Sequence, residues 1–201
     1  MPKFNSTPIQ PTKIVCIGKN YAAHIEEMGG LKPDDMTVFI KPSTALSDTL
    51  HSTLGETLHY ETEICLLVNA GQVRGIAVGF DLTKRETQNG LKKHGLPWER
   101  AKAFDGAAVM SDFVAAPDSL DDLNLTLHVN GELRQQGHVS MMLYPPAVIL
   151  SELSHFMTLR DQDVIMTGTP AGVGPLEAGS EYKACVYNGD QLLVSQTWSA
   201  V

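Results

Sequence analysis

Two Asn-Gly pairs, each lying between two runs of alternating apolar and polar residues, most constrain how this chain can fold. The pairs are Asn130-Gly131 and Asn188-Gly189, and the flanking runs are residues 125–129, 132–135, 182–187 and 191–198. An Asn-Gly pair readily adopts the positive φ angles of a two-residue hairpin turn, and a period of two is typical of β-strands. The chain is therefore expected to contain at least two antiparallel hairpins.

More strands and three short helices are expected along the rest of the chain. The apolar runs with the length of strands are residues 13–17, 37–40, 58–68 and 73–80. The helical patterns are residues 20–28, 83–93 and 146–157. Thr83 and Glu86 have capping-box spacing, and a third Asn-Gly pair, Asn89-Gly90, lies inside the helical pattern. Strands outnumber helices, so we predict an α+β fold that is rich in β-structure, with a few short helices.

Length and composition indicate one globular domain. The chain has 201 residues, of which 43% are hydrophobic and 19% charged, and no repeat or linker divides it. Residues 1–12 contain three prolines and are expected to form an extended N-terminal leader. Residues 13–201 are expected to form a single domain.

The charge balance and the cysteines exclude several classes of protein. The formal net charge of −8 argues against nucleic acid or an anionic membrane as the main partner, but it is compatible with a small anionic substrate. No run approaches the roughly 18 apolar residues that a membrane helix needs, and the N-terminus has no apolar signal segment. The three cysteines, which lie far apart, form neither a disulfide framework nor a zinc cluster. We therefore expect a cytoplasmic protein.

Glu61 and Glu63 stand two residues apart in the apolar run 58–68, so in a strand their side chains point to the same face. Adjacent carboxylates repel each other, and a solvated strand end is one arrangement that tolerates them. The alternative is a shared cation. A hairpin around residues 69–72 would bring Asp81 near the pair, and three carboxylates without a His or Cys ligand suit Mg²⁺ or Mn²⁺.

His24 and Glu27 share one face of the predicted helix 20–28 because they lie three residues apart. The pair is either an exposed ion pair or a general base oriented by a carboxylate. Lys102 is either a solvated lysine or a positive contact for an anion. The glycine-rich segment 167–174 fits a tight turn, and the chain has no serine-hydrolase, zinc-protease or P-loop motif.

Seven short segments occur in the order found in one known family. They are residues 17–24 (IGKNYAAH), 39–43 (FIKPS), 61–63 (ETE), 79–83 (GFDLT), 95–98 (GLPW) leading to Lys102, 129–132 (VNGE) and 167–174 (TGTPAGVG). In these segments the chain resembles the fumarylacetoacetate hydrolase family, in its short single-domain branch of acylpyruvate hydrolases and oxaloacetate decarboxylases. The resemblance extends from about Lys13 to the C-terminus and implies a mixed β-sandwich roll that usually forms a homodimer.

The resemblance also implies roles for individual residues. The implied ligands of Mg²⁺ or Mn²⁺ are Glu61, Glu63 and Asp81, the implied catalytic residues are His24, Glu27 and Lys102, and the implied substrate-binding residues are Lys41, Gln88, Thr169 and Lys19. Lys19 stands where many relatives have arginine, so a bidentate grip on a carboxylate is not expected there. Residues 105–110 lack the proline that many relatives carry after the lysine.

The resemblance implies a small anionic 2-oxo acid as substrate. The first expectation is hydrolysis of a C–C bond in a 2,4-dioxo acid of the acylpyruvate or fumarylpyruvate type, with His24 activating water and the cation polarising the substrate. Decarboxylation of oxaloacetate ranks second and keto–enol isomerisation third. Both reactions would use the same metal site. A non-catalytic metal-binding module is the remaining alternative, and the complete set of site residues speaks against it.

Overall fold

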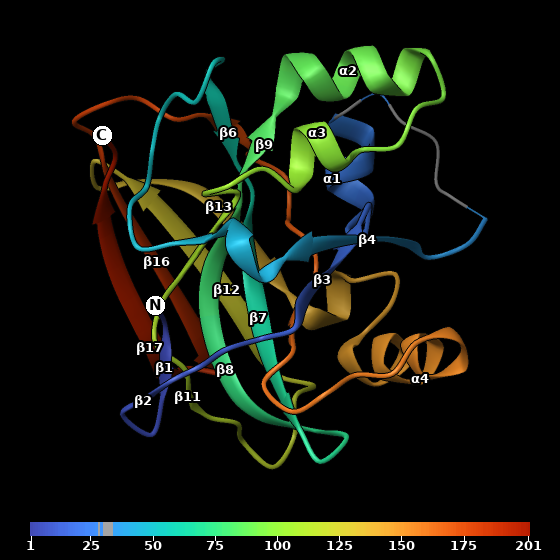
Figure 1. Ribbon diagram of the computed structural model, residues 1–201. Helices are drawn as coiled ribbons and strands as arrows, with labels where there is room; N and C mark the ends of the chain where they lie inside the picture. Colours follow the sequence, from blue (N-terminus) through green and yellow to red (C-terminus); the bar gives the residue numbers. More distant parts are fainter. Residues whose placement is uncertain (28, 30–33) are drawn as a thin grey trace.

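Antiparallel hairpins dominate the fold, as the alternating sequence runs predict (Figure 1). The computed structural model describes residues 1–27, 29 and 34–201. The largest sheet is mixed, and its path of strands is β4 (Thr37–Pro42), β3 (Lys13–Gly18), β14 (Val164–Met166), β7 (Thr62–Asn69), β8 (Gln72–Asp81), β10 (Ala108–Met110) and β5 (Leu46–Ser47). An eighth strand, β11 (Val114–Ala115), pairs with β8. The pairs β14–β3 and β10–β5 are parallel.

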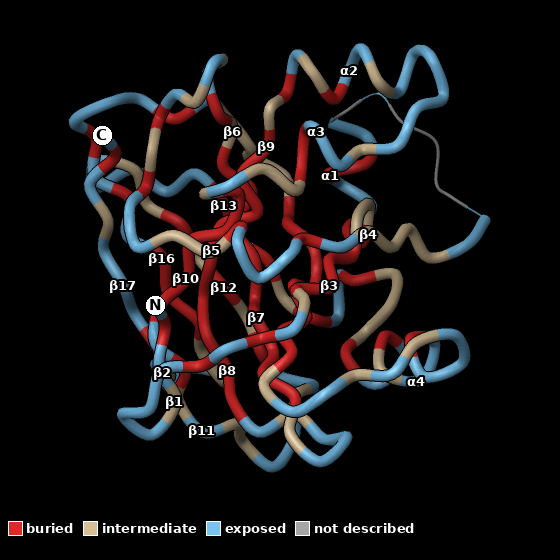
Figure 2. Tube along the Cα trace, in the orientation of Figure 1, coloured by how far each residue is buried: buried red, intermediate tan, exposed pale blue. Residues whose placement is uncertain are grey.

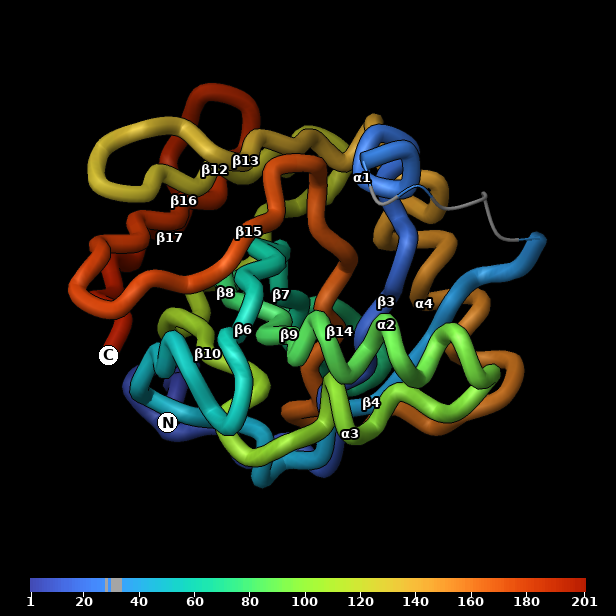
Figure 3. Tube along the Cα trace, turned by 90° about the horizontal axis from the view of Figure 1, so that it is seen from above, coloured from blue at the N-terminus to red at the C-terminus, as the bar shows by residue number. Residues whose placement is uncertain are grey.

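A four-stranded antiparallel sheet forms the second layer (Figure 3). Its order is β13 (Glu132–His138), β12 (Leu123–Val129), β16 (Glu181–Asn188) and β17 (Gln191–Ser199). Both predicted hairpins lie in this sheet, and Asn130 and Gly131 have φ angles of 50° and 84° at the first turn. β16 and β17 contact β8, while β12 contacts β7. The prediction of a β-rich α+β fold, a mixed β-sandwich roll, is confirmed.

The side chains of β7 alternate between two hydrophobic clusters. Ile64, Leu66 and Val68 belong to the cluster between the two sheets, whereas Cys65 and Leu67 belong to the cluster on the opposite face of the large sheet. Figure 2 shows buried residues along most of the length of β7 and β8. Because both faces of β7 are covered, a charged residue on this strand needs a specific partner.

In the described part of the chain, four α-helices and two 3₁₀ helices connect the strands. They are α1 (Ala22–Glu27), α2 (Arg85–Lys93), α3 (Glu99–Lys102), α4 (Pro146–Phe156), η1 (Ser43–Ala45) and η2 (Val139–Met141). A small sheet contains β15 (Gly174–Pro175), β6 (Leu58–Tyr60) and β9 (Thr83–Lys84), and β9 connects β8 to α2 along the chain. Within the described residues, no helix is long and apolar enough to cross a membrane.

One local prediction differs from the structure, and the N-terminal segment contains two short strands. In residues 1–12, Asn5 and Ser6 adopt positive φ angles and turn the chain between β1 (Lys3–Phe4) and β2 (Thr7–Pro8). Thr83 does not cap the following helix but lies in β9, and the helix begins at Arg85. The Thr83 hydroxyl instead accepts a hydrogen bond from the Lys102 ammonium group at 2.6 Å.

Candidate metal centre and active site

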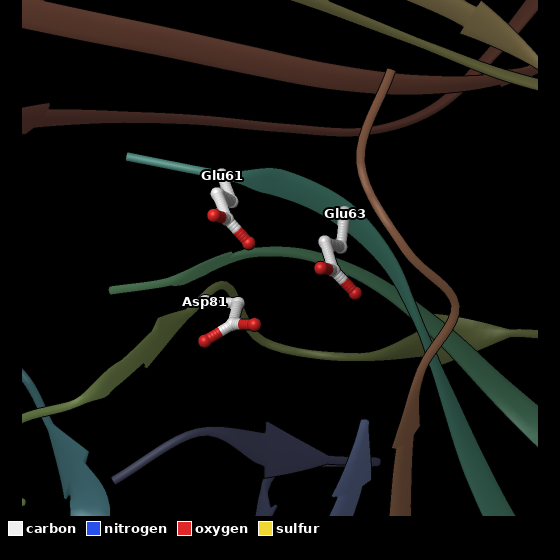
Figure 4. A group of neighbouring side chains, drawn as sticks. All are labelled: Glu61, Glu63 and Asp81. Atoms are coloured by element: carbon white, nitrogen blue, oxygen red, sulfur yellow. The ribbon is translucent and has the colours of Figure 1, made fainter. Parts of the chain in front are cut away.

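The three acidic residues singled out from the sequence lie together at one end of the β7–β8 hairpin (Figure 4). Glu61 occupies the break between β6 and β7, Glu63 is in β7, and Asp81 is the last residue of β8. One carboxylate oxygen from each residue lies within 4.8 Å of the others. The three residues are 7%, 2% and 1% exposed. The site is therefore buried, and the alternative of a solvated strand end is wrong.

Two of these carboxylates have cationic partners within the protein. The Lys102 ammonium group lies 2.8 Å from Glu61 Oε2 and 2.7 Å from Asp81 Oδ2. Lys41 Nζ lies 2.7 Å from Asp81 Oδ1, and Arg85 forms an ion pair with Glu61. Although burial opposes ionisation, Lys102 and Arg85 hold the pKa of Glu61 below its usual range. Glu61 is therefore ionised in the folded protein.

Glu63 is the carboxylate that lacks such compensation. None of the described Lys, Arg or His side chains forms an ion pair with it, and its Oε2 accepts a hydrogen bond from the Gly168 amide at 2.7 Å. Burial and the neighbouring Asp81 and Glu61 carboxylates raise its pKa well above the ordinary value. A divalent cation at this point would offset that repulsion. An all-oxygen, all-carboxylate donor set fits Mg²⁺ or Mn²⁺.

A cavity of about 380 Å³ opens beside the carboxylates. Its lining includes one metal-site carboxylate, the histidine of α1, four cationic side chains and two aromatic rings, namely Glu61, His24, Lys19, Arg85, Lys92, Lys102, Phe39 and Trp98. The volume is in the range of small-molecule sites in proteins. The positive lining of the cavity suits a small anion, although the whole chain is acidic.

His24 and Glu27 form the pair expected from their spacing on α1. His24 Nδ1 lies 3.1 Å from Glu27 Oε2, and Glu27 Oε1 accepts a hydrogen bond from the Gly172 amide at 2.9 Å. Glu27 thus links the imidazole to the segment that contains Gly172, and its carboxylate is the partner of Nδ1. Nε2 has no hydrogen-bond partner within the described part of the chain and remains for a substrate.

The glycine-rich segment 167–174 supplies backbone donors to both parts of the site. The Gly168 amide holds Glu63, and the Gly172 amide holds Glu27. Both glycines have positive φ angles, 97° and 98°, and a Cβ atom on Gly172 would lie 1.9 Å from the Arg134 carbonyl oxygen. The segment is a turn, as its composition predicts, but its glycines also allow close backbone approach to two carboxylates.

The sequence-predicted substrate-binding residues divide into two groups. Gln88 and Lys19 line the cavity, whereas Lys41 and Thr169 do not. Lys41 is fully buried and forms an ion pair with Asp81, so it positions a metal-site carboxylate. Thr169 accepts a hydrogen bond at 2.8 Å from Gln135, whose side-chain oxygen accepts one from the Thr62 amide. Thr169 therefore supports the strand segment between Glu61 and Glu63.

Arg85 and Lys92 are site residues that the sequence analysis missed. Arg85 contacts Glu61, and its Nη1 donates a hydrogen bond to Gln88 Oε1 at 2.7 Å. Gln88 and Lys92 follow Arg85 by three and seven residues, so all three lie on one face of α2. This spacing was a usable signal, because Gln88 alone already assigned that face of the helix to the site.

Comparison with protein-family models matches residues 13–197 to the C-terminal domain of fumarylacetoacetate hydrolase. The chain belongs to the fumarylacetoacetate hydrolase family. This result confirms the resemblance seen in the seven segments, and it makes the chain an enzyme of that family rather than a non-catalytic module.

Individual members of the fumarylacetoacetate hydrolase family resemble the chain over most of its length. An oxaloacetate tautomerase of Escherichia coli K12 is 41% identical over 189 residues, which cover 85% of this chain and 86% of the relative. A mitochondrial oxaloacetate tautomerase of Homo sapiens is 38% identical over 92% of this chain and 90% of its own. The structure of fumarylpyruvate hydrolase from Pseudomonas aeruginosa, in complex with Mn²⁺ and pyruvate, is 30% identical, with a TM-score of 0.84 over 100% of this chain and 94% of the other.

Proposed function

We propose that the protein catalyses the keto–enol tautomerisation of oxaloacetate, with Mg²⁺ or Mn²⁺ bound by Glu61, Glu63 and Asp81. The observation that carries the proposal is a cavity lined by Glu61, one of the three grouped carboxylates, and by His24, whose Nε2 has no hydrogen-bond partner among the described residues. The tautomerase names of relatives at 41% and 38% identity support this choice of reaction. The proposal puts isomerisation first, whereas the sequence-based ranking placed hydrolysis first and isomerisation third.

The chemistry requires little beyond polarisation and a proton carrier. The keto and enol forms of oxaloacetate differ only in whether one proton lies on carbon 3 or on the 2-oxygen. A bound divalent cation supplies Lewis-acid polarisation of the 2-oxo group and its neighbouring carboxylate. His24 accepts the proton at one position and returns it at the other, so no reactant is consumed. Glu27 orients the imidazole through the contact with Nδ1.

The remaining residues orient the substrate and the carboxylates. Lys102 donates to Glu61, Asp81 and Thr83, and from this position its ammonium group would contact the reacting oxygens of the substrate. Gln88 and Lys19 line the cavity and would contact the carboxylate end of the substrate. Lys41 and Thr169 act indirectly. Lys41 holds Asp81, and Thr169 supports the segment between Glu61 and Glu63.

Hydrolysis of an acylpyruvate or fumarylpyruvate is the second candidate. The His24–Glu27 pair favours it, because the same imidazole could take a proton from water instead of from carbon 3. The similarity to the fumarylpyruvate hydrolase of Pseudomonas aeruginosa points the same way. Decarboxylation of oxaloacetate would use the cation and need no base.

Product analysis separates these reactions. Enol-oxaloacetate and acetylpyruvate are each mixed with the protein and Mg²⁺, and the loss of the enol absorbance is followed with pyruvate and acetate measured in parallel. We expect fast enol loss from oxaloacetate without pyruvate, and no activity in EDTA. His24→Gln should slow the reaction about 100-fold while Mn²⁺ binding by calorimetry is unchanged, whereas the exposed His94→Gln control should be fully active. Pyruvate as the main product would overturn the proposal in favour of decarboxylation, and acetate with pyruvate would favour hydrolysis.

A further inference from the structure

Among the described residues, four cationic side chains line the cavity, but two of them are neutralised by the protein itself. Lys102 contacts the carboxylates of Glu61 and Asp81. Arg85 contacts Glu61 and also donates to Gln88. These two cations therefore balance the charge of the metal-site carboxylates, and their attraction for a second anionic group of a substrate is reduced.

Lys92 is different. Lys92 forms no ion pair with any residue that the structure describes. Residues 28 and 30–33, which the structure does not describe, include no Asp or Glu. The Lys92 ammonium group lies 5.2 Å from the centre of the Trp98 ring, which also lines the cavity. Cation–π contact with an aromatic ring restrains the lysine on the cavity wall without neutralising its charge. Lys92 thus presents an uncompensated positive charge to the cavity.

Lys92 lies farther along α2 than Arg85, which contacts a metal-site carboxylate. Arg85, Gln88 and Lys92 follow one face of the helix over two turns, so Lys92 is about 10 Å farther along the helix axis than Arg85. Arg85 is in contact with Glu61, whereas Lys92 contacts none of the three carboxylates. A substrate whose 1-carboxylate and 2-oxo group occupy the metal end would extend its other end along this face.

We infer that Lys92 binds the distal carboxylate of a dicarboxylic 2-oxo acid and thereby determines specificity for substrates with a second anionic group. The inference rests on the proposed function for the identity of the acid, oxaloacetate. Lys19 also lines the cavity, but it follows β3 and therefore comes from a different element than Lys92. Lys92 would therefore affect the binding of oxaloacetate more than that of a monocarboxylic 2-oxo acid.

The test compares oxaloacetate with 2-oxobutyrate, in which a methyl group replaces the distal carboxylate. Dissociation constants are measured by calorimetry in Mg²⁺ for the unmodified protein and for Lys92→Met, Lys92→Arg, Lys19→Met and Lys93→Met. Lys93 is the matched control, because it is exposed on the same helix and does not line the cavity. Lys92→Met should weaken oxaloacetate about tenfold, the effect of one charge-assisted hydrogen bond, and leave 2-oxobutyrate unchanged. Lys92→Arg should restore most of the binding, and Lys93→Met should behave like the unmodified protein.

Three outcomes would overturn the inference. They are equal binding of the two acids by the unmodified protein, equal weakening of both by Lys92→Met, and loss of the preference in Lys19→Met but not in Lys92→Met. Activity is assayed separately on the same variants. A Lys92-dependent preference without tautomerisation would refute the proposed function and leave the inference intact, whereas tautomerisation without such a preference would do the reverse.

Discussion

At the scale of single residues, the deprotonation of Lys92 should be visible in the pH dependence of kcat/KM. Although the Lys92 side chain is exposed, partial desolvation at the cavity wall and the Arg85 guanidinium lower its pKa to about 8, with Lys102 and Lys19 acting in the same direction and Glu61 against them. The ammonium group is therefore charged below about pH 8 and neutral above it. If Lys92 binds the distal carboxylate, kcat/KM for oxaloacetate should fall severalfold between pH 7 and pH 9.5.

The Lys92→Arg variant provides the check on this pH dependence. A guanidinium stays protonated over the whole range, so the decrease that belongs to Lys92 should disappear from the pH profile of kcat/KM. The profile of the exposed control Lys93→Arg should match that of the unmodified protein. An unchanged decrease in Lys92→Arg would assign the titration to another group.

The metal-site carboxylates were predictable residue by residue, and two of the cations around them were not. Alternation in a strand fixes which face Glu61 and Glu63 share, and a hairpin brings the end of the next strand, with Asp81, beside them. A charged residue on a helix, by contrast, has the same local pattern whether it faces solvent or a cavity. Without the resemblance, which assigns Gln88 to the site, Arg85 and Lys92 could be placed only once the orientation of α2 was known.

At the scale of elements, the glycine-rich segment couples a turn to two side chains of the site. Replacing Gly172 with alanine would place a Cβ atom 1.9 Å from the Arg134 carbonyl oxygen, so the segment must shift and the hydrogen bond to Glu27 must break. We expect Gly172→Ala to reduce kcat about 10-fold or more through the misplaced imidazole. The affinity for Mn²⁺, measured by calorimetry, should change little.

Gly90→Ala is the matched control for this substitution. Gly90 lies inside α2 with open space around its Cβ position, and alanine there should stabilise the protein by about 0.5–1 kcal/mol without reducing activity. Wild-type kcat in Gly172→Ala, or a loss of Mn²⁺ binding as large as the loss of kcat, would contradict a role of this segment in positioning the Glu27–His24 pair.

The long, strongly patterned elements were predictable, whereas the short ones were not. The two hairpins follow from alternation with Asn-Gly turns, but β14 is a three-residue strand in the middle of the large sheet and is too short to show a period. The start of α2 differs from the prediction because Glu56, a residue far back in the chain, accepts hydrogen bonds from the backbone and hydroxyl of Thr87. No local pattern indicates such a cap.

At the scale of the whole molecule, the uncompensated charge of Glu63 links metal binding to stability. Saturation with Mn²⁺ should raise the melting temperature by about 5–10 °C, the effect of binding at roughly 100 times the dissociation constant in a protein of this size. Glu63→Gln should remove that increase. It should also raise the melting temperature of the metal-free protein, because a neutral amide does not repel Glu61 and Asp81.

Thermal denaturation with and without Mn²⁺ measures both effects. Glu86→Gln, an exposed change on α2, serves as the control and should keep the full Mn²⁺ response. A Glu63→Gln variant that is still stabilised by Mn²⁺ would show that the cation binds elsewhere. A metal-free variant less stable than the unmodified protein would show that the Gly168 hydrogen bond outweighs the charge repulsion.

A second buried carboxylate, Asp163, connects the N-terminal part of the chain to the centre of the large sheet. It is fully buried just before β14 and accepts hydrogen bonds from the Thr12 amide and hydroxyl, the Lys13 amide and ammonium group, and the Arg160 amide. β14 and β3 are parallel partners, so Asp163 fixes their relative register where β3 begins. Although burial opposes ionisation, the hydrogen bonds from Lys13, Arg160 and Thr12 lower its pKa.

This lowered pKa predicts how stability depends on pH. A group whose pKa is lower in the folded state contributes stability above its unfolded value, about 3.9 for aspartate, and loses that contribution as the pH falls through its folded value. Asp163→Asn should therefore reduce the unfolding free energy by about 2–4 kcal/mol at pH 7, because it replaces a charged acceptor of several hydrogen bonds. Urea denaturation at pH 7, 5 and 3 should show a constant difference from the unmodified protein down to about pH 4, and a smaller difference at pH 3. The exposed Asp190→Asn control should have no effect on the unfolding free energy at any of the three pH values. If the difference for Asp163→Asn were as large at pH 3 as at pH 7, the shape of the side chain and not its charge would fix the register.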